Sequence, residues 1–207
     1  MKASPPRHEL RHRLERFREL LARESLSGAL ITDVSNVHYL SGFTGDDSAL
    51  LVTQRHRILL TDFRYIEEGR QSAPGWRRVV KPPGLMEKAG EVARKLRVKR
   101  LGIEAGNLCV KGLSELRRHA RGVKVRLPKP LVEELRALKS EWEVRQIEKA
   151  LRIQERSFLE TCRLLRPGMH EYEAAAELRH RMVRAGADDQ AFQIMFQWGA
   201  NSSLPHG

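Results

Sequence analysis

The chain has 207 residues, of which 41% are hydrophobic and 31% charged, and its formal net charge is +12. A chain of this length can bury a core without disulfides or metals. No apolar run is long enough for a membrane-spanning helix, and residues 1–8 are not followed by the apolar stretch of a secretory signal. The two cysteines, Cys109 and Cys162, exclude a disulfide framework and a four-cysteine zinc site, so we expect a cytoplasmic protein with reduced thiols.

The positive charge is mostly arginine and is spread along the chain. A basic protein attracts nucleic acid without a dedicated site. A protein that recognises a specific nucleic acid usually also has a recognisable motif or an aromatic surface on which bases stack. Aromatic residues are only 6% of the sequence, and it carries no such motif. We therefore expect no specific nucleic-acid partner, while an acidic protein partner stays open.

Hydrophobic spacing predicts an N-terminal helix followed by alternating strands and helices. Apolar residues recur at helical spacing from Leu10 to Leu21, and Gly28 suits the end of this helix. Short apolar runs predict strands over 29–32, 49–53, 58–61, 76–80, 101–103 and 123–127. Helices are predicted over 62–69, 85–96 and 113–120, and a turn over 81–84. Strands that alternate with helices favour an α/β layered fold.

The pattern changes near residue 130, which we take as a domain boundary. A helix is predicted over 131–138, and Ser140 and Glu143 then have the spacing of a capping box that begins a long amphipathic helix ending near Pro167. A helix over 171–185 and a strand over 192–198 follow. A lone strand needs partners for its edges, so these elements are too few to close a domain. We therefore expect the second domain to be unfinished, or to be completed by another chain.

The first helix carries an H-E-x-x-H pattern at His8, Glu9 and His12. On a helix such histidines share one face and can bind zinc, with the glutamate as the general base. Arginines surround the pattern, it lies near a chain terminus, and no third ligand stands nearby. We therefore favour a solvated first helical turn over a zinc site.

Two further patterns favour ordinary structural roles. Glu177 and His180 have the E-x-x-H spacing of di-iron helices, but those sites need a second copy and two more glutamates. Cys109 and His119 could suggest a thiol nucleophile with its base, although nothing in the sequence brings them together. We therefore expect both cysteines to be small buried residues with a structural role.

The C-terminal segment carries the most specific motif. Residues 199–206 read Gly-Ala-Asn-Ser-Ser-Leu-Pro-His after a predicted strand. They resemble the Gly-x-Asn-Ser/Ala-x-x-Pro-His pattern of the Xaa-Pro aminopeptidases and prolidases, the creatinase-related metallopeptidases. Further segments are similar to the N-domain signature at 36–45, the Thr-Asp-x-Arg-Tyr segment at 61–65, the inter-domain segment at 138–147 and the next helix start at 166–173. Order and spacing fit throughout, so the resemblance covers nearly all of residues 10–207.

The resemblance implies a creatinase-type N-terminal α/β domain over 8–130. Residues 131–207 would be the first helices and strand of an α+β "pita-bread" catalytic domain. Family members use two divalent metal ions, commonly Mn²⁺, to hydrolyse the bond before proline, since two metals acidify a bridging water and polarise the carbonyl. In the family all five metal ligands follow the motif histidine. The resemblance therefore implies no metal ligand in this chain and no hydrolysis by the chain alone.

The resemblance also implies roles for four residues. His206 corresponds to the histidine that hydrogen-bonds the substrate near the scissile bond and is not a metal ligand, and its imidazole suits proton handling near pH 7. Because the family's N-domain often supports oligomers and reaches a neighbour's active site, Asp62, Arg64 and Tyr65 could line a substrate path. Arg64 could bind a peptide carboxylate with two hydrogen bonds. A capped helix start with an ordinary surface arginine is the alternative interpretation.

Two function hypotheses follow. The favoured one is the N-terminal portion of a metal-dependent Xaa-Pro peptidase, part of a homo-oligomer that acts on peptides with proline in second position. The alternative is a non-catalytic module of the same fold that binds peptides or proteins.

Overall fold

The computed structural model describes residues 4–80 and 84–205, and the turn predicted over 81–84 lies mostly outside them. The chain divides after Leu138 into two compact units, and each is described by itself. Within the described residues, no helix combines the length and the apolar composition that a membrane crossing requires.

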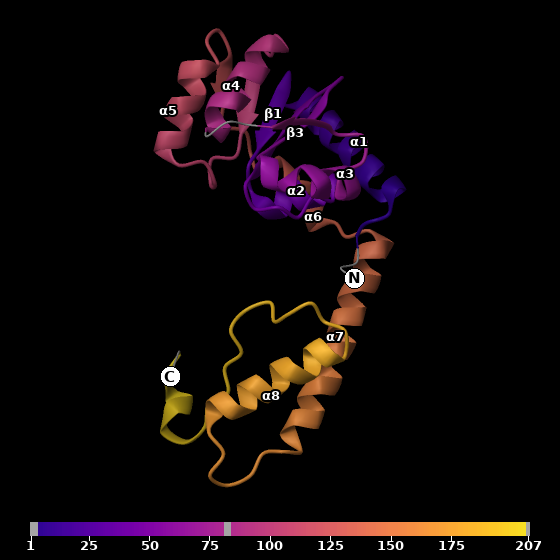
Figure 1. Cartoon of the computed structure of the whole chain (residues 1–207), viewed down its shortest axis with the longest axis vertical. Helices are drawn as coiled ribbons and strands as arrows, with labels where there is room; N and C mark the ends of the chain where they lie inside the picture. The colour runs from indigo at the N-terminus through magenta and orange to yellow at the C-terminus, as the bar shows by residue number, and fades with distance from the viewer. Residues whose placement is uncertain (1–3, 81–83, 206–207) are drawn as a thin grey trace. The chain divides into compact units, whose positions relative to one another are not determined.

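The first unit is a sheet with helices on both faces (Figure 1). Its strands are β1 (Gly28–Ile31), β2 (Ser48–Thr53), β3 (Arg57–Thr61), β4 (Arg77–Val80), β5 (Arg100–Ile103) and β6 (Lys124–Arg126). Its α-helices are α1 (Arg7–Arg23), α2 (Val34–Ser41), α3 (Ile66–Ser72), α4 (Leu85–Lys95), α5 (Val110–His119) and α6 (Leu131–Ala137), and a short 3₁₀ helix, η1 (Phe63–Tyr65), precedes α3. The predicted α/β layered fold is confirmed.

The sheet has the strand order β4-β3-β2-β1-β5-β6. β2 pairs antiparallel with both of its neighbours, whereas the β1–β5, β3–β4 and β5–β6 pairs are parallel. All strands except β2 therefore run in one direction. As a result, one edge of the sheet collects the starts of five strands and the opposite edge collects their ends.

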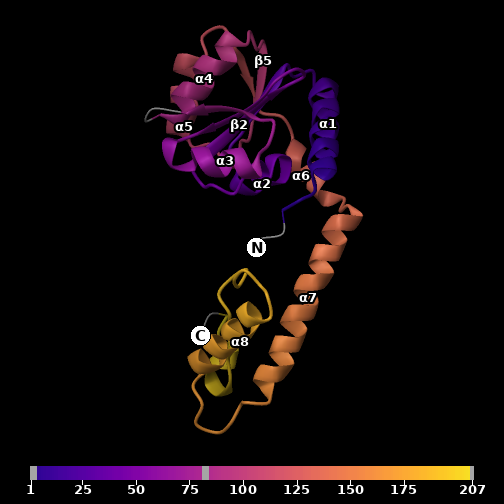
Figure 2. The same ribbon diagram turned by 45° about the vertical axis from the view of Figure 1, so that its right-hand side comes forward.

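Apolar side chains on the two faces of the sheet form two cores. On β1, Ala29 and Ile31 belong to the core under α1, α2 and α6, whereas Leu30 belongs to the core under α4 and α5. This is the alternation expected of a strand that is buried on both faces. Figure 2 shows α1 and α6 on one side of the sheet and α4 and α5 on the other.

A buried amide ties together the ends of β1 and β5. The fully buried side chain of Asn36 donates to Glu104 and to Glu133, at 2.7 Å each, and accepts from Arg136 at 2.8 Å. Glu104 also accepts from the backbone N–H groups of Thr32 (2.5 Å) and Asp33 (2.8 Å). A buried polar group stabilises a fold only when it is hydrogen-bonded. This network satisfies the Asn36 side chain from the end of β5 and from α6, and Glu104 connects it to the end of β1.

In the first unit, α1 and α2 differ from the sequence prediction. α1 ends at Arg23, before the predicted Gly28, because Ser25 takes a left-handed φ of 54° and the Leu26 N–H returns to the Leu21 carbonyl at 2.8 Å. α2 was not predicted at all. Asp33 caps it by accepting from the Asn36 N–H, and a short capped helix of eight residues carries little periodic signal.

The first unit extends beyond the predicted boundary at residue 130. α6 packs its apolar face, Leu131, Val132 and Leu135, into the core shared with α1 and α2. The compact unit therefore reaches Leu138, because α6 buries more apolar surface against the sheet than a linker would.

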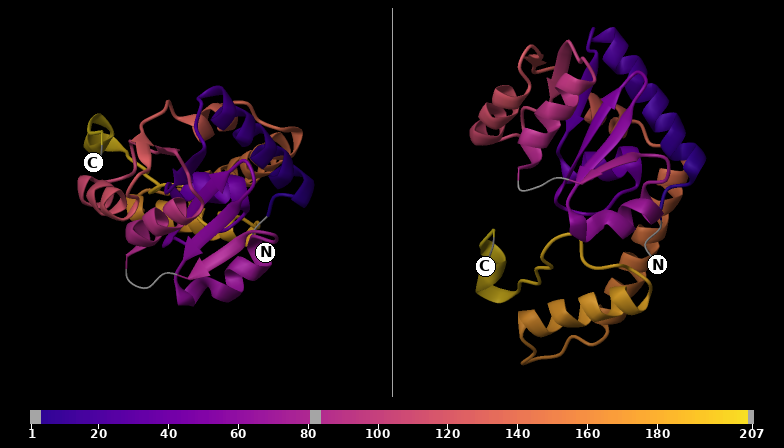
Figure 3. Two further views of the ribbon diagram at one scale, coloured as in Figure 1. Left: turned by 90° about the horizontal axis from the view of Figure 1, so that it is seen from above. Right: turned by 45° about the horizontal axis from the view of Figure 1, so that its top comes forward.

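The second unit consists of α7 (Glu141–Cys162), α8 (Glu171–Arg184), an irregular segment and the short 3₁₀ helix η2 (Gly199–Ser203), as Figure 3 shows. The predicted capping box of α7 is present. The Glu143 N–H donates to the Ser140 hydroxyl at 3.3 Å, and the Ser140 N–H donates to the Glu143 carboxylate at 2.8 Å. α7 ends at Cys162, before the predicted Pro167.

The strand predicted over 192–198 is wrong, because this segment has no regular secondary structure. A strand needs a hydrogen-bonded neighbour, and the described part of the second unit contains no other strand. Side chains of α8 hold this part of the chain instead. Glu171 accepts from the Trp198 N–H at 2.8 Å. Arg179 donates to Asp189, which precedes the segment, at 2.8 and 3.0 Å, and this lowers the pKa of Asp189 to about 2.

We expect Phe17→Ala to destabilise the first unit by about 3–5 kcal/mol, because Phe17 is fully buried and its loss leaves a cavity. Phe63→Ala is the matched control, since Phe63 is 74% exposed, and should change stability by less than about 0.5 kcal/mol. Hydrogen exchange of the amides of β2 and β3 measures the free energy of opening in this unit. Equal effects of the two substitutions would contradict the assigned core.

Candidate functional site

The three residues predicted to face a substrate lie together where β3 ends. Asp62 follows the strand and caps η1 by accepting from the backbone N–H of Arg64 at 2.8 Å. The Arg64 guanidinium also donates to the Asp62 carboxylate, from Nε at 2.9 Å and from Nη2 at 2.6 Å. These hydrogen bonds hold the pKa of Asp62 below its usual range. The Arg64 side chain is still 57% exposed, so its other N–H groups are accessible to a ligand.

Tyr65 is oriented by contacts with the loop before β2. Its hydroxyl donates to Asp46, which raises the pKa of Tyr65 and lowers that of Asp46. Its ring meets Phe43 edge to face at 5.9 Å between centroids, and the Arg64 guanidinium lies 5.3 Å from its centre. The ring and the hydroxyl are therefore both held in place.

Sequence reasoning missed two carboxylates of this cluster. Asp47 lies 3.6 Å from the Arg64 guanidinium, and Asp46 receives the Tyr65 hydroxyl. Both follow directly on the signature at 36–45, but nothing local connects them with residues 62–65. β2 is antiparallel to β3, so its start lies at the edge where β3 ends, and this places the two segments together.

Gly45 lets the two segments approach closely. A Cβ atom at this position would lie 2.5 Å from the Phe43 ring and 2.8 Å from the Tyr65 ring. Real Cβ atoms do not come so close to other atoms, so any larger residue would move both rings. The signature glycine thus has a packing role in the site.

The second unit carries an open pocket of about 790 Å³ between α8 and the irregular segment. Glu171 at the start of α8 accepts from the Trp198 N–H at 2.8 Å and from the Asn201 amide at 2.9 Å, and these bonds lower the pKa of Glu171. They hold the family motif against α8. His206, the predicted substrate-side histidine, lies outside the described residues.

The H-E-x-x-H pattern does not form a zinc site. Glu9 is buried and forms an ion pair with Arg13 at 3.2 Å, and Arg13 also donates to the Tyr39 carbonyl at 3.1 Å. His8 and His12 are exposed on the same helix. Glu9 and Arg13 thus attach α1 to α2, which is a structural role.

The other two candidate patterns are also explained by the structure. Cys109 caps the start of α5 and His119 ends the same helix, which places them roughly 15 Å apart at 1.5 Å per residue. The predicted burial of both cysteines is wrong, because Cys109 is exposed at this cap and Cys162 is only partly buried. Glu177 is paired with Arg181 at 2.7 Å, and His180 is exposed. Within the described residues, no group of three or more His, Cys, Asp or Glu side chains could hold a metal ion.

Two family models match the chain in succession. The model of the Creatinase/Prolidase N-terminal domain matches residues 13–138, and that of Metallopeptidase family M24 matches residues 145–207. The chain belongs to the creatinase/prolidase family. The predicted family is therefore confirmed, and the match of the first model ends at Leu138, as the first unit does.

Curated relatives and solved structures agree with this assignment. The uncharacterized peptidase YqhT of Bacillus subtilis is 29% identical over 94% of this chain and 55% of its own length, and an Xaa-Pro dipeptidase of Pyrococcus horikoshii is 26% identical over 96% and 55%. The solved Xaa-Pro dipeptidase from Bacillus anthracis is 27% identical, with a TM-score of 0.88 over 96% of this chain and 56% of that one. The chain spans about half the length of the curated relatives it matches.

We expect Arg64→Met to raise the pKa of Asp62, because the variant removes the hydrogen bonds that lower it. The lowered pKa stabilises the fold above the ordinary aspartate pKa of about 3.9, and this contribution is lost as the pH falls through the lower folded value. A carbon-13 NMR titration of the Asp62 carboxyl measures the shift. Arg70→Met removes an exposed partner of Glu67 and serves as the control. An unchanged Asp62 pKa in Arg64→Met would refute the pairing.

We expect Gly45→Ala to destabilise the first unit by about 1–3 kcal/mol, because the added methyl group overlaps two aromatic rings. Displacement of Tyr65 should also return its raised pKa toward the ordinary value, which an ultraviolet titration detects. Gly106→Ala is the control, since a Cβ atom there meets nothing within 4 Å. A Gly45→Ala protein as stable as the Gly106→Ala protein would show that the close approach is unimportant.

Proposed function

We propose that this chain is the N-terminal portion of a metal-dependent Xaa-Pro peptidase, which hydrolyses the peptide bond before proline. The observation that supports this most is the succession of the two family models along the chain, together with its similarity to about half the length of an Xaa-Pro dipeptidase. A homo-oligomer and a cytoplasmic location belong to the same proposal.

The described residues do not provide the ligands for the two divalent metal ions, commonly Mn²⁺, that the family resemblance implies. His206 is proposed to hydrogen-bond the substrate near the scissile bond.

Asp62, Arg64 and Tyr65 are proposed to line the path of the peptide. Arg64 is already held by Asp62 and Asp47, and Asp46 accepts from the Tyr65 hydroxyl, so this cluster has three carboxylates and one guanidinium. Such a cluster carries a net negative charge at neutral pH. It suits the positively charged amino terminus of a peptide better than the peptide carboxylate that the sequence analysis assigned to Arg64.

The test is the intact mass of the polypeptide made by its source, together with the DNA that follows the Gly207 codon and an assay for proline release with Mn²⁺. We expect a polypeptide longer than 23.8 kDa that releases proline from an Xaa-Pro dipeptide, and no release by the 207-residue chain alone. Release by the 207-residue chain would refute the need for further residues. Peptide binding without hydrolysis by the source polypeptide would favour the non-catalytic module.

In the active source polypeptide, we expect Asp47→Asn to raise KM for the dipeptide about two- to fivefold with little change in kcat, because an exposed charge interaction is worth at most about 1 kcal/mol. Glu115→Gln on α5 removes the same charge away from the cluster and serves as the control. Equal KM values for the two variants would show that the cluster does not line the substrate path.

A further inference from the structure

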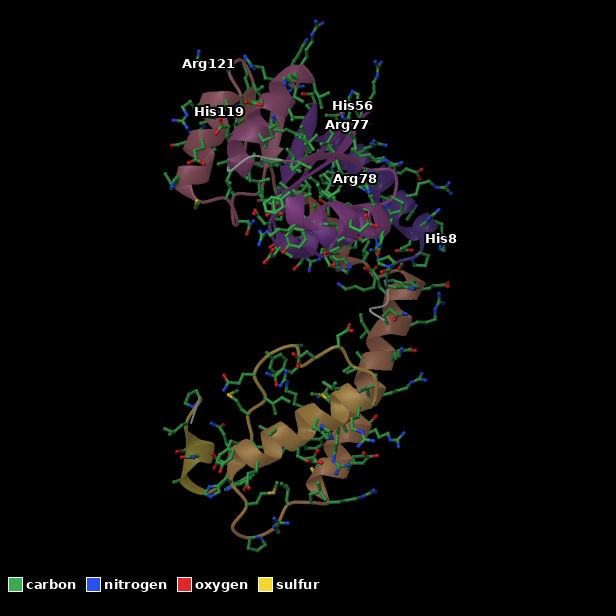
Figure 4. The ribbon with its side chains drawn as sticks, viewed as in Figure 1. His8, His56, Arg77, Arg78, His119 and Arg121 are labelled. Carbon is green, nitrogen blue, oxygen red and sulfur yellow. The ribbon has the colours of Figure 1, made fainter. Side chains whose placement is uncertain are left out.

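The edge of the sheet where the strands start carries a row of basic side chains. Arg77 begins β4, Arg57 begins β3, Arg100 begins β5 and Lys124 begins β6. Two turns at the same edge add Arg55 and Arg121. We call these six residues the basic edge. Figure 4 shows Arg77, His56 and Arg121 at this end of the first unit.

The strand register staggers these residues along the strands. Arg100 pairs directly with Lys124. Arg57 is level with Gly102, two residues beyond Arg100, and Arg77 is level with Ile103, three residues beyond it. Six strands at a spacing of about 4.8 Å give the basic edge a width of roughly 24 Å. That width corresponds to about seven base pairs of a nucleic-acid duplex, whose backbone carries a regular series of negative charges.

The cations of the basic edge are available to a ligand. Arg77, Arg100, Arg121 and Lys124 are exposed, and none of the four forms an ion pair with a described carboxylate. Cations at helix C-termini often serve only to offset the helix dipole. That explanation does not apply to Arg77, Arg100 and Lys124, which belong to strands, whereas Arg121 follows Ala120, the residue that caps the C-terminus of α5.

The basic edge lacks the apolar anchors of a protein interface. Among the described residues of the first unit, the exposed large hydrophobic side chains follow the ends of strands or lie at the boundary of the unit. They are Val34, Phe63, Val80, Val110, Leu127 and Leu138. Protein interfaces depend on a buried apolar or aromatic centre, and single-stranded nucleic acids are bound by aromatic stacking. Contacts to a phosphate backbone need neither an apolar centre nor aromatic stacking.

We propose that the basic edge binds the phosphodiester backbone of duplex nucleic acid without reading its sequence. This inference does not depend on the proposed peptidase function. It agrees with the absence of a sequence-reading motif, because arginine and lysine contacts to phosphates position a duplex but carry no base information.

The test measures binding of the whole chain to labelled duplexes of about 20 base pairs by fluorescence anisotropy, between about 50 and 200 mM KCl. We expect DNA and RNA duplexes to bind, with an affinity that falls linearly with salt on logarithmic axes and is the same for a scrambled sequence. Absence of binding at about 50 mM KCl would overturn the proposal.

A triple variant locates the contact. Arg77→Gln, Arg121→Gln and Lys124→Gln together should make the salt slope shallower by roughly 2–3, because each lost phosphate contact removes about 0.9. The control triple Arg70→Gln, Lys111→Gln and Lys129→Gln removes the same charge elsewhere and should leave the slope nearly unchanged. Equal effects of the two triples would overturn the proposal, because diffuse net charge would then explain the binding.

Three further measurements test this interpretation. Circular dichroism checks that the basic-edge triple variant is folded. A variant with Arg77→Lys and Arg121→Lys, in which Lys124 is unchanged, should restore the salt slope, because it keeps the charge. Polyglutamate at equal charge should displace the duplex poorly. Displacement as effective as that by unlabelled duplex would assign the basic edge to an acidic protein and overturn the proposal.

Discussion

The common direction of five strands is the constraint on which the rest of the first unit depends. Because β1, β3, β4, β5 and β6 run the same way, residues at the starts and ends of strands far apart in sequence collect at opposite edges. The two edges differ in the charge and polarity of their side chains. The strand-start edge carries the basic row, while the strand-end edge carries most of the unit's polar network and its exposed apolar side chains.

The acidic character of the strand-end edge follows from what comes after each strand. Asp33 and Glu104 follow β1 and β5, and Asp62 follows β3. Asp46 and Asp47 precede β2, whose reversed direction brings its start to this edge. The carboxylates are not left unpaired, because backbone N–H groups, Asn36, Arg64 and Tyr65 hydrogen-bond to them. The edge can therefore present charge to a ligand without a large cost to the fold.

The two proposed activities use different edges of one unit, so they can be tested independently. A peptide amino terminus would be attracted to the carboxylates around Arg64, and a phosphate backbone would be attracted to the basic edge. The separation also keeps like charges apart, since a duplex on the strand-start edge would not approach the acidic cluster. Substitutions at one edge should therefore leave binding at the other unchanged.

The sequence by itself determined the local features of this protein. Apolar spacing predicted most strands and helices of the first unit, the Ser140–Glu143 pair predicted the start of α7, and five short motifs identified the family. Only the tertiary structure brought Asp46 to Tyr65 and Asp47 to Arg64, gathered the basic residues where the strands start, and showed residues 192–198 without the strand that their composition favours. The physical reason is that spacing along the chain encodes periodicity and caps. Pairing across a sheet depends on strand direction and on the presence of a partner, which no local pattern contains.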